Sequence, residues 1–321
     1  MTIDRARLPA DIVLAAHRLR GYVRETPLDY SPFYSDVGGA NVYLKLENLQ
    51  HTASFKLRGA FNKLLALTPE QKKSGGVAAS SGNHGAAIAH AMQKLGIEGV
   101  IFVPEKTAST KVDAIRLAGA EVRFFGTDGL DTETHARAYA EEHGMVYLSP
   151  YNDVDVIVGQ GTCGFEIAKQ LSRVDAAFIA VGGGGLISGV GAFLKSVNPD
   201  CEIYACQPQA SPVMTESVKA GKIVDMPSEP TLSDGTAGGI EAGAITFDLC
   251  REIADDYLLV SEEDIGVAMR GFIDAHHMLL EGAAGVAIAG YLQAMDALEG
   301  RNVVIVVCGG NISRETLKKI L

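Results

Sequence analysis

Three turns in this sequence hold residue types suited to covalent and anion-binding chemistry. They are residues 54–59, 80–85 and 182–185. Each comes after a strand-like run. In open α/β sheets, ligands collect at the carboxyl ends of the strands, where loop amides and helix N-termini point outward.

The third turn is a run of four glycines, Gly182, Gly183, Gly184 and Gly185, between a strand-like segment and a helix-like one. Successive glycines let the backbone approach an anion closely and aim several N–H groups at it. No Gly-Lys-Ser/Thr follows and no acid ends the next strand, so the loop is neither a P-loop nor a dinucleotide fingerprint. The plain alternative is a tight turn that needs positive φ. The pattern favours a phosphate group without a nucleotide.

The second turn combines hydroxyl groups with an amide at the start of a helix-like segment. It reads Ser80, Ser81, Gly82, Asn83, His84. These groups suit a carboxylate or a phenolate oxygen, although the same residues also make an ordinary turn and helix cap.

The first turn contains Lys56, which follows Ser54 and Phe55 and stands among apolar residues. Burial would lower the pKa of this amine and make it a nucleophile toward an aldehyde. The alternative is a lysine that extends its charged end into water.

The three turns together supply the parts that hold pyridoxal 5′-phosphate. Lys56 would condense with the aldehyde, Asn83 would bond the ring oxygen, and the glycine loop would bind the phosphate. This combination predicts a pyridoxal-phosphate site.

The elements that must position these turns alternate between strand-like and helix-like segments, which is typical of parallel βαβ units. Residues 75–149 form one compact series of such units, and a second series runs from residue 150 to the strand-like segment 302–307. Residues 209–245 are rich in Gly, Pro and Ser without periodicity, so they are predicted to be loops. The fold class is therefore α/β, with parallel twisted sheets flanked by helices.

The composition excludes several classes of protein. The 321 residues have 28 Lys and Arg against 39 Asp and Glu, a net charge of −11, which disfavours nucleic-acid binding. No apolar run is long enough to span a membrane, and the N-terminus lacks the apolar stretch of a signal peptide. Five scattered cysteines, without CxxC spacing, predict neither a disulfide framework nor a zinc cluster. We expect a cytoplasmic protein.

The chain resembles the fold-type II pyridoxal-phosphate enzymes, in the branch with threonine/serine dehydratases and serine racemase. Cysteine synthase and its siblings carry different lysine and Asn-loop motifs, which makes sulfhydrylation less favoured. The motifs that carry the resemblance are KLENLQHTASFKLRGA (45–60), SSGNHG (80–85), DVIVGQGT (155–162), VGGGGLISG (181–189), TLSDG (231–235), LLEGAAGVA (279–287) and CGGN (308–311).

The resemblance implies a role for each matching residue. Lys56 bonds to the cofactor aldehyde, Asn83 to its O3 oxygen, and Gly182 through Gly185 to its phosphate, while Phe55 lies beside the ring. Cys308 stands where the family usually has a Ser opposite the pyridine nitrogen, and a thiol is a weak hydrogen-bond partner. The residues implied for the substrate carboxylate are Ser54, Ser80, Ser81, Asn83 and His84.

The implied activity is an ammonia-lyase that converts a β-hydroxy-α-amino acid to a 2-oxo acid and ammonia. L-Threonine and L-serine are the expected substrates. In the family, Ser at position 81 is typical of racemases and hydroxyaspartate dehydratases, so racemisation with Lys56 and Ser81 as the two acid/bases is the alternative. Dehydration of 3-hydroxyaspartate, phenylserine or a hydroxyectoine-derived substrate also stays open.

Several positions depart from the racemase pattern. Gln207 and Val213 replace a Glu and an Asp of a divalent-metal site, so no metal is predicted. Tyr151 and Gly238 replace an Asn and a Ser, which suggests a different or bulkier β-substituent, although Tyr151 is equally interpreted as a packing residue.

The resemblance also implies a two-domain arrangement. The large domain would comprise residues 1–50 and 150–321, with a small domain at 51–149 and a homodimer as the family's usual assembly. No regulatory domain is expected after Leu321. Two other readings are a nicotinamide-dependent oxidoreductase, which leaves the Lys56 and Asn83 turns unexplained, and a protein that binds pyridoxal phosphate without turnover.

Overall fold

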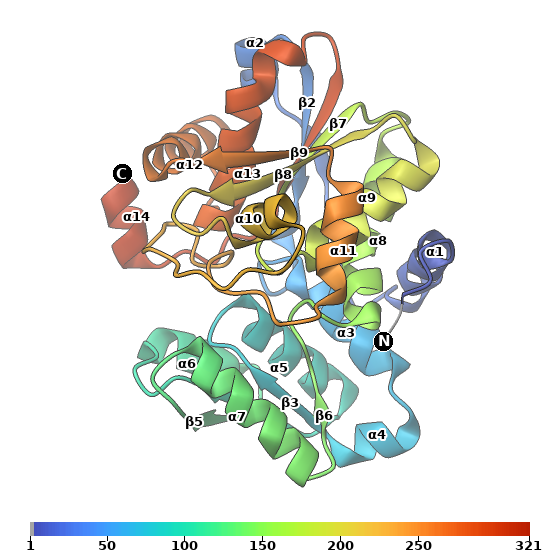
Figure 1. Ribbon diagram of the computed structural model, residues 1–321, viewed down its shortest axis with the longest axis vertical. Coiled ribbons are helices and arrows are strands. Elements are labelled where there is room, and N and C mark those ends of the chain that lie inside the picture. The colour runs from blue at the N-terminus through green and yellow to red at the C-terminus, as the bar shows by residue number, and fades with distance from the viewer. Residues whose placement is uncertain (1–2) are drawn as a thin grey trace.

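The computed structural model describes residues 3–321, which form two bodies that each surround one sheet, the upper and lower parts of Figure 1. The larger sheet has the order β1-β2-β10-β7-β8-β9, in which only β1 runs antiparallel to its neighbour. Its strands are β1 (Leu28–Tyr30), β2 (Asn41–Leu46), β7 (Ala176–Ala180), β8 (Glu202–Pro208), β9 (Asp256–Val260) and β10 (Asn302–Val307).

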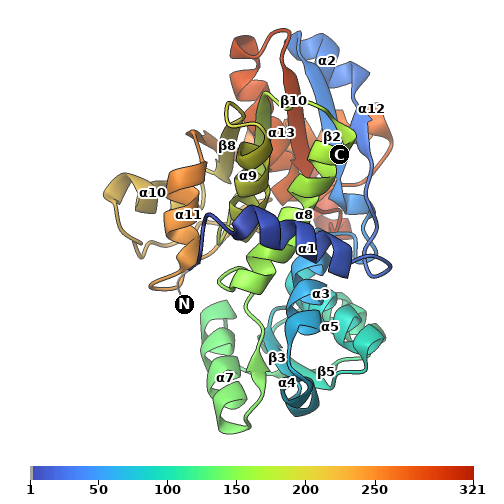
Figure 2. The same ribbon diagram turned by 90° about the vertical axis from the view of Figure 1, so that its right-hand side faces the viewer.

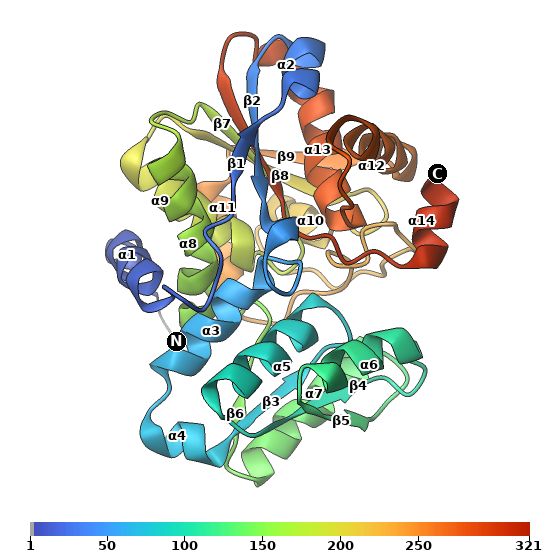
Figure 3. The ribbon, with the colours of Figure 1, turned by 180° about the vertical axis from the view of Figure 1, so that it is seen from behind.

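Helices cover both faces of the larger sheet (Figure 3). One face carries α1 (Leu8–Arg18), α8 (Val154–Gln170), α9 (Gly185–Val197) and α11 (Ile245–Ile253). The other face carries α2 (Pro32–Gly38), α12 (Glu262–His276), α13 (Gly282–Ala294) and α14 (Arg314–Ile320). Parallel strands covered in this way are buried on both faces, which explains why β7 and β10 are continuous apolar runs.

The smaller sheet is parallel throughout, in the order β5-β4-β3-β6. Its strands are β3 (Gly76–Ala79), β4 (Gly99–Val103), β5 (Glu121–Phe124) and β6 (Val146–Tyr147). One face packs against α5 (Asn83–Leu95) and α6 (Ser109–Leu117), the other against α7 (Gly129–Glu142).

Helix α3 (Lys56–Ala66) joins the two bodies, because it packs on both α5 and α8, as Figure 2 shows. The remaining elements are short: α4 (Pro69–Ser74), α10 (Val213–Ala220) and the 3₁₀ turns Glu47–Leu49 and Met295–Ala297.

The structure confirms the α/β class and the strand–helix series of residues 75–149. The prediction that residues 209–245 contain only loops is wrong, because α10 lies within them. Val213 and Met214 of this helix are buried in the core of the larger body, and Gly221 ends it with φ +68°. An eight-residue helix is too short to show clear periodicity in the sequence. Within residues 3–321, no helix combines the length and apolar character needed to cross a membrane.

Candidate active site

Lys56 is the first residue of α3 and is held at the junction of the two bodies. Its Nζ donates to the carbonyl oxygen of Pro150 at 2.9 Å, and it lies 5.2 Å from the centre of the Phe55 ring. Burial lowers the pKa of this amine to about 8, although the neighbouring Cys308 and Glu281 oppose the shift. A larger share of the amine is therefore neutral, and nucleophilic, near pH 7 than for an ordinary lysine.

The turn before Lys56 is tied to the end of β10. Ser54 forms a β-bridge with Gly309, and the Phe55 N–H donates to the Cys308 carbonyl at 3.0 Å. Ala53 adopts φ +53°, an unfavourable conformation for a residue with a side chain, and its carbonyl accepts from the Gly310 N–H. These bonds place the lysine beside the carboxyl end of the central strand.

The four glycines connect β7 to α9 and pack closely against other parts of the larger body. A Cβ built on Gly183 would lie 2.3 Å from the ring of Tyr151, and one on Gly184, where φ is +85°, would lie 2.6 Å from Cys250 Sγ. The first i−4 bond of α9 joins Ser188 N–H to the Gly184 carbonyl, so the N–H groups ahead of it are available to an anion. The loop fits a phosphate group.

Tyr151 connects this loop to the lysine. It follows Pro150, whose carbonyl holds Lys56, and its ring lies on Gly183 while its hydroxyl accepts from the Glu241 N–H at 2.9 Å. The aromatic ring therefore packs on the glycine loop, in agreement with the packing interpretation, and it does so at the border of the site.

The Ser80–His84 turn leads from β3 into α5. The first i−4 bond of α5 joins Ala86 N–H to the Gly82 carbonyl, which leaves the N–H groups of Asn83 and His84 available at the helix N-terminus. Ser80 Oγ accepts from Gly82 N–H at 3.2 Å. The turn therefore has amide donors and hydroxyl groups that suit a carboxylate.

The His84 side chain is bonded to the backbone next to the site. Its imidazole is buried and lies 2.8 Å from the Leu148 carbonyl, and burial together with the Lys56 charge lowers its pKa to about 3. The ring is therefore neutral with Nε2 engaged, and the backbone N–H of His84 is available to a substrate. Ser81 is half-buried, and its side chain forms no hydrogen bond within the described part of the chain.

Sequence reasoning missed Glu281, the residue before α13. Its buried carboxylate accepts from Asn83 Nδ2 at 2.9 and 2.8 Å, and Cys308 Sγ lies 3.9 Å from Oε1. Burial raises the pKa of Glu281 to about 7 and that of Cys308 well above its usual value. The signal was a single charged residue in the otherwise uncharged run 279–291.

The position expected to have lost a metal ligand is a satisfied amide in the structure. Gln207 Oε1 accepts from the N–H and hydroxyl of Thr215, and Nε2 donates to the Ser211 carbonyl. Among residues 3–321, no three His, Cys, Asp or Glu side chains are grouped as metal ligands.

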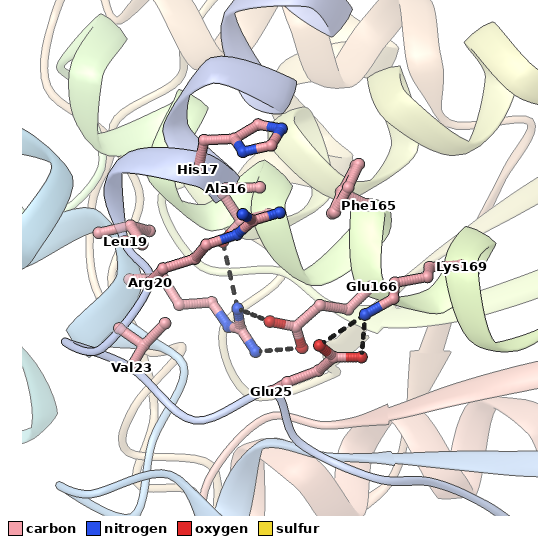
Figure 4. Close-up of a pocket in the computed structure, with 11 residues that line it drawn as sticks. Ala16, His17, Leu19, Arg20, Val23, Glu25, Phe165, Glu166 and Lys169 are labelled. Carbon is pink, nitrogen blue, oxygen red and sulfur yellow. Dashed lines mark hydrogen bonds and ion pairs between the residues drawn. The ribbon is translucent and has the colours of Figure 1, made fainter.

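A separate pocket of about 90 Å³ lies between the end of α1 and α8, and none of the predicted site residues lines it. Figure 4 shows Glu25, Glu166 and Lys169 on its wall. Arg58, two residues after the lysine, also lines the pocket and bonds both Glu47 and Glu166 at 2.7 Å. This pocket therefore lies beside the buried ion pairs that anchor α3, the helix that begins with Lys56.

The rate at which the protein captures pyridoxal phosphate is expected to rise with pH up to about pH 8 and then level off. The neutral amine attacks the aldehyde, and the pKa of Lys56 is lowered to about 8 from the ordinary 10.5. Stopped-flow absorbance between pH 6 and 10 measures this rate, and a small lysine analogue corrects for titration of the cofactor. A rate that keeps rising to pH 10.5 contradicts the buried amine.

Gly183→Ala is expected to weaken pyridoxal-phosphate binding about tenfold, because the new methyl group pushes the Tyr151 ring and shifts the loop. Titration of the cofactor-free protein by visible absorbance measures the affinity. Gly129→Ala is the matched control, since a Cβ there meets nothing within 4 Å. Adding Tyr151→Ala should restore part of the loss if the clash is its cause.

Comparisons with known proteins agree with this geometry. The family model described as pyridoxal-phosphate dependent enzyme matches residues 19–309. The chain is 39% identical to an L-threonine ammonia-lyase from Thermotoga maritima over 311 residues, which cover 97% of this chain and 77% of that protein.

Two solved structures are similar in fold and in sequence. Threonine deaminase isoform 2 from Solanum lycopersicum has a TM-score of 0.94 at 35% identity, covering 99% of this chain and 92% of that one. Maize serine racemase has a TM-score of 0.91 at 32% identity, covering 97% and 95%.

Proposed function

The chain belongs to the family of pyridoxal-phosphate dependent enzymes, and from that premise we propose that it is an ammonia-lyase acting on a β-hydroxy-α-amino acid. The substrate would be L-threonine, L-serine or a bulkier analogue, and the products a 2-oxo acid and ammonia. The observation that carries this proposal is the buried Lys56 amine. This amine donates to the carbonyl of Pro150, and the next residue, Tyr151, packs on the glycine loop. The cofactor is pyridoxal 5′-phosphate.

The residues present fit this cofactor. The glycine loop of residues 182–185 would hold the phosphate, because close packing at Gly183 and Gly184 leaves no room for side chains there. Asn83 would donate to the ring oxygen, Cys308 would face the ring nitrogen, and Phe55 would lie beside the ring. The residues proposed for the substrate carboxylate are Ser54, Ser80, Ser81, Asn83 and the backbone of His84.

When bound, the cofactor delocalises the electron pair that remains at Cα after a proton is lost. Lys56 is the proposed base that takes this proton, and its lowered pKa suits proton transfer near neutral pH. The α5 N-terminus would orient the substrate carboxylate. Loss of the Cα proton and the β-hydroxyl as water, followed by hydrolysis, yields the 2-oxo acid and ammonia.

Racemisation is the second candidate, and the half-buried Ser81 hydroxyl without a hydrogen-bond partner in the described residues favours it. Ser81 would return a proton to the face of Cα opposite Lys56. The similarity to maize serine racemase supports this alternative.

Gly238, Tyr151 and Glu241 lie in the region proposed to hold the β-substituent of the substrate. Gly238 has φ +121° and open space at its Cβ position. The Tyr151 hydroxyl accepts from the N–H of Glu241, three residues further along the chain. Arg137 of α7 bonds Glu241 at 2.7 Å from the opposite body, while Glu241 Oε1 is buried without a partner in the described chain. The open space at Gly238 supports a bulkier β-hydroxy amino acid, such as phenylserine or a hydroxyectoine-derived compound, whereas the Glu241 carboxylate disfavours the second carboxylate of 3-hydroxyaspartate.

The deciding experiment incubates the purified protein with L-serine and L-threonine and quantifies the 2-oxo acid, ammonia and both enantiomers. Oxo acid and ammonia in equal amounts with little D-isomer establish the lyase. D-Serine that accumulates faster than oxo acid establishes the racemase, and Ser81→Ala should then abolish it. If neither forms, the bulkier analogues are assayed, and absence of turnover on all of them rejects the proposal.

We further propose that residues 51–149 form a small domain, that residues 1–50 and 150–321 form the large domain, and that the protein is a cytoplasmic homodimer. The exposed apolar side chains Phe33 and Val37 on α2 support a partner surface. Light scattering of the wild type and Phe33→Glu tests the dimer, and cell fractionation tests the location.

A further inference from the structure

The carboxylate of Glu281 lies at the centre of the site, although none of the roles assigned above uses it. It is 5% exposed and packs on the backbone of Gly309, where a Cβ would lie 2.6 Å from Oε1. Both of its oxygens lie within 2.9 Å of Asn83 Nδ2. Asn83 and Cys308, which contact Glu281, are the residues proposed to face the two polar positions of the cofactor ring.

Two partners fix the orientation of the Asn83 amide. Its Nδ2 faces Glu281, and its Oδ1 accepts from Asn311 Nδ2 at 2.6 Å. An ionised carboxylate has no proton to donate, so it can only accept from the NH₂ side of the amide. The reversed amide would place its oxygen against the carboxylate and its NH₂ against another NH₂.

We propose that Glu281 is a positioning residue that holds the Asn83 amide with its second N–H directed at the phenolic oxygen of pyridoxal phosphate. The inference rests on the cofactor placement of the proposed function, but it does not depend on which substrate is used. A donor at that oxygen stabilises its negative charge, whereas a reversed amide would repel it.

The ionisation of Glu281 controls this orientation. Burial raises its pKa to about 7, opposed by the hydrogen bonds from Asn83 and Asn311 and by the Lys56 charge, and assisted by Asp234. The titratable groups that face it are thus Lys56, Asp234 and the Cys308 thiol. Below pH 7 the protonated Glu281 carboxyl can face either the NH₂ or the oxygen of the Asn83 amide. The amide is then no longer held with its N–H toward the cofactor oxygen, so cofactor binding should weaken as the pH falls.

The experiment titrates the cofactor-free protein with pyridoxal phosphate at pH 6 and pH 8, using absorbance of the bound cofactor and equilibrium dialysis. Glu281→Leu removes the acceptor and is expected to weaken binding about tenfold at pH 8. Glu281→Gln keeps an acceptor without a charge, so it should stay within about threefold at pH 8. At pH 6, about nine tenths of a group with a pKa of 7 is protonated. The protonated carboxyl resembles the Gln side chain, so the wild type should lose about threefold more affinity between pH 8 and pH 6 than the Gln variant.

Glu202→Gln is the control, because this carboxylate pairs with Arg301 at the start of β8 and lies outside the site. A Leu variant with wild-type affinity, or a Gln variant with the wild-type pH profile, overturns the proposal. If Glu281→Leu does not fold by circular dichroism, Asn311→Asp decides, since it removes the donor to Asn83 Oδ1 and should weaken binding in the same direction. These readouts need no turnover, so failure of the proposed activity would leave them interpretable.

Discussion

Lys56→Ala is expected to lower kcat/KM for the β-hydroxy amino acid by at least about a thousandfold. The amine is both the proposed covalent anchor of the cofactor and the proposed base at Cα, and the Pro150 carbonyl is the only hydrogen-bond partner of Nζ within the described residues. A methyl side chain can perform neither role. The visible band of the lysine-bound cofactor should also be lost, because no other amine is buried at that point of α3.

Coupled detection of the 2-oxo acid and an absorbance spectrum measure both consequences. Lys195→Ala is the matched control, since that lysine pairs with Asp255 on the surface at the far end of α9. A Lys56→Ala protein that retains a tenth of the activity would show that another group removes the proton. One that retains the visible band would move the covalent anchor elsewhere.

Arg58→Leu is expected to lower the free energy of unfolding by about 3–5 kcal/mol. The guanidinium is completely buried and donates to Glu47 at 2.7 and 2.8 Å and to Glu166 at 2.7 Å. Burial alone would raise the pKa of Glu47, yet the Arg58 charge holds it below the usual value of 4.5. Without Arg58, two carboxylates lose their principal cation, and Lys45 remains paired only with Glu166.

Denaturant unfolding followed by circular dichroism measures this loss. The double variant Arg58→Leu with Glu47→Leu removes the cation and the fully buried anion together, so it should recover most of the stability. The exposed pair Arg251–Asp248 supplies the control, because Arg251→Leu is expected to cost at most about 1 kcal/mol. A loss below about 1 kcal/mol for Arg58→Leu would show that water or rearrangement compensates the buried carboxylates.

The same pair makes stability depend on pH with a definite sign. Because the folded-state pKa of Glu47 is lowered, its contribution is complete above the unfolded value of 4.5 and is lost as the pH falls from there through the lower folded-state pKa. The wild type should therefore lose stability in acid more steeply than the Arg58→Leu, Glu47→Leu double variant. Parallel acid titrations would contradict the assigned ion pair.

Local pattern in the sequence determined the class of fold and the chemical parts of the site. Short continuous apolar runs bounded by turn residues, such as β7 and β10, indicate strands covered on both faces, and the turns that follow such strands lie at the carboxyl edge of a sheet. Lys56, Asn83 and the four glycines carry their chemistry in their residue types, so each could be recognised without a partner in view.

Two helices, α13 and α10, could not be predicted from local pattern. Ten residues of α13 are buried, and its apolar side chains surround the whole helix, so no period of 3.6 marks it. Helix α10 is too short for any period to be seen. Both are fixed by the space left between neighbouring elements of the larger body, which no local pattern encodes.

Only the tertiary structure decided which groups face one another. Asn83 and Glu281 are separated by 198 positions, Lys56 and Pro150 by 94, and the Tyr151 hydroxyl and the Glu241 N–H by 90. Such contacts arise because the carboxyl ends of two parallel sheets meet across α3, and the packing of the sheets sets the distances. The sequence therefore determined what chemistry this protein carries, while the tertiary structure decided how its lysine, amide and carboxylate are held and charged.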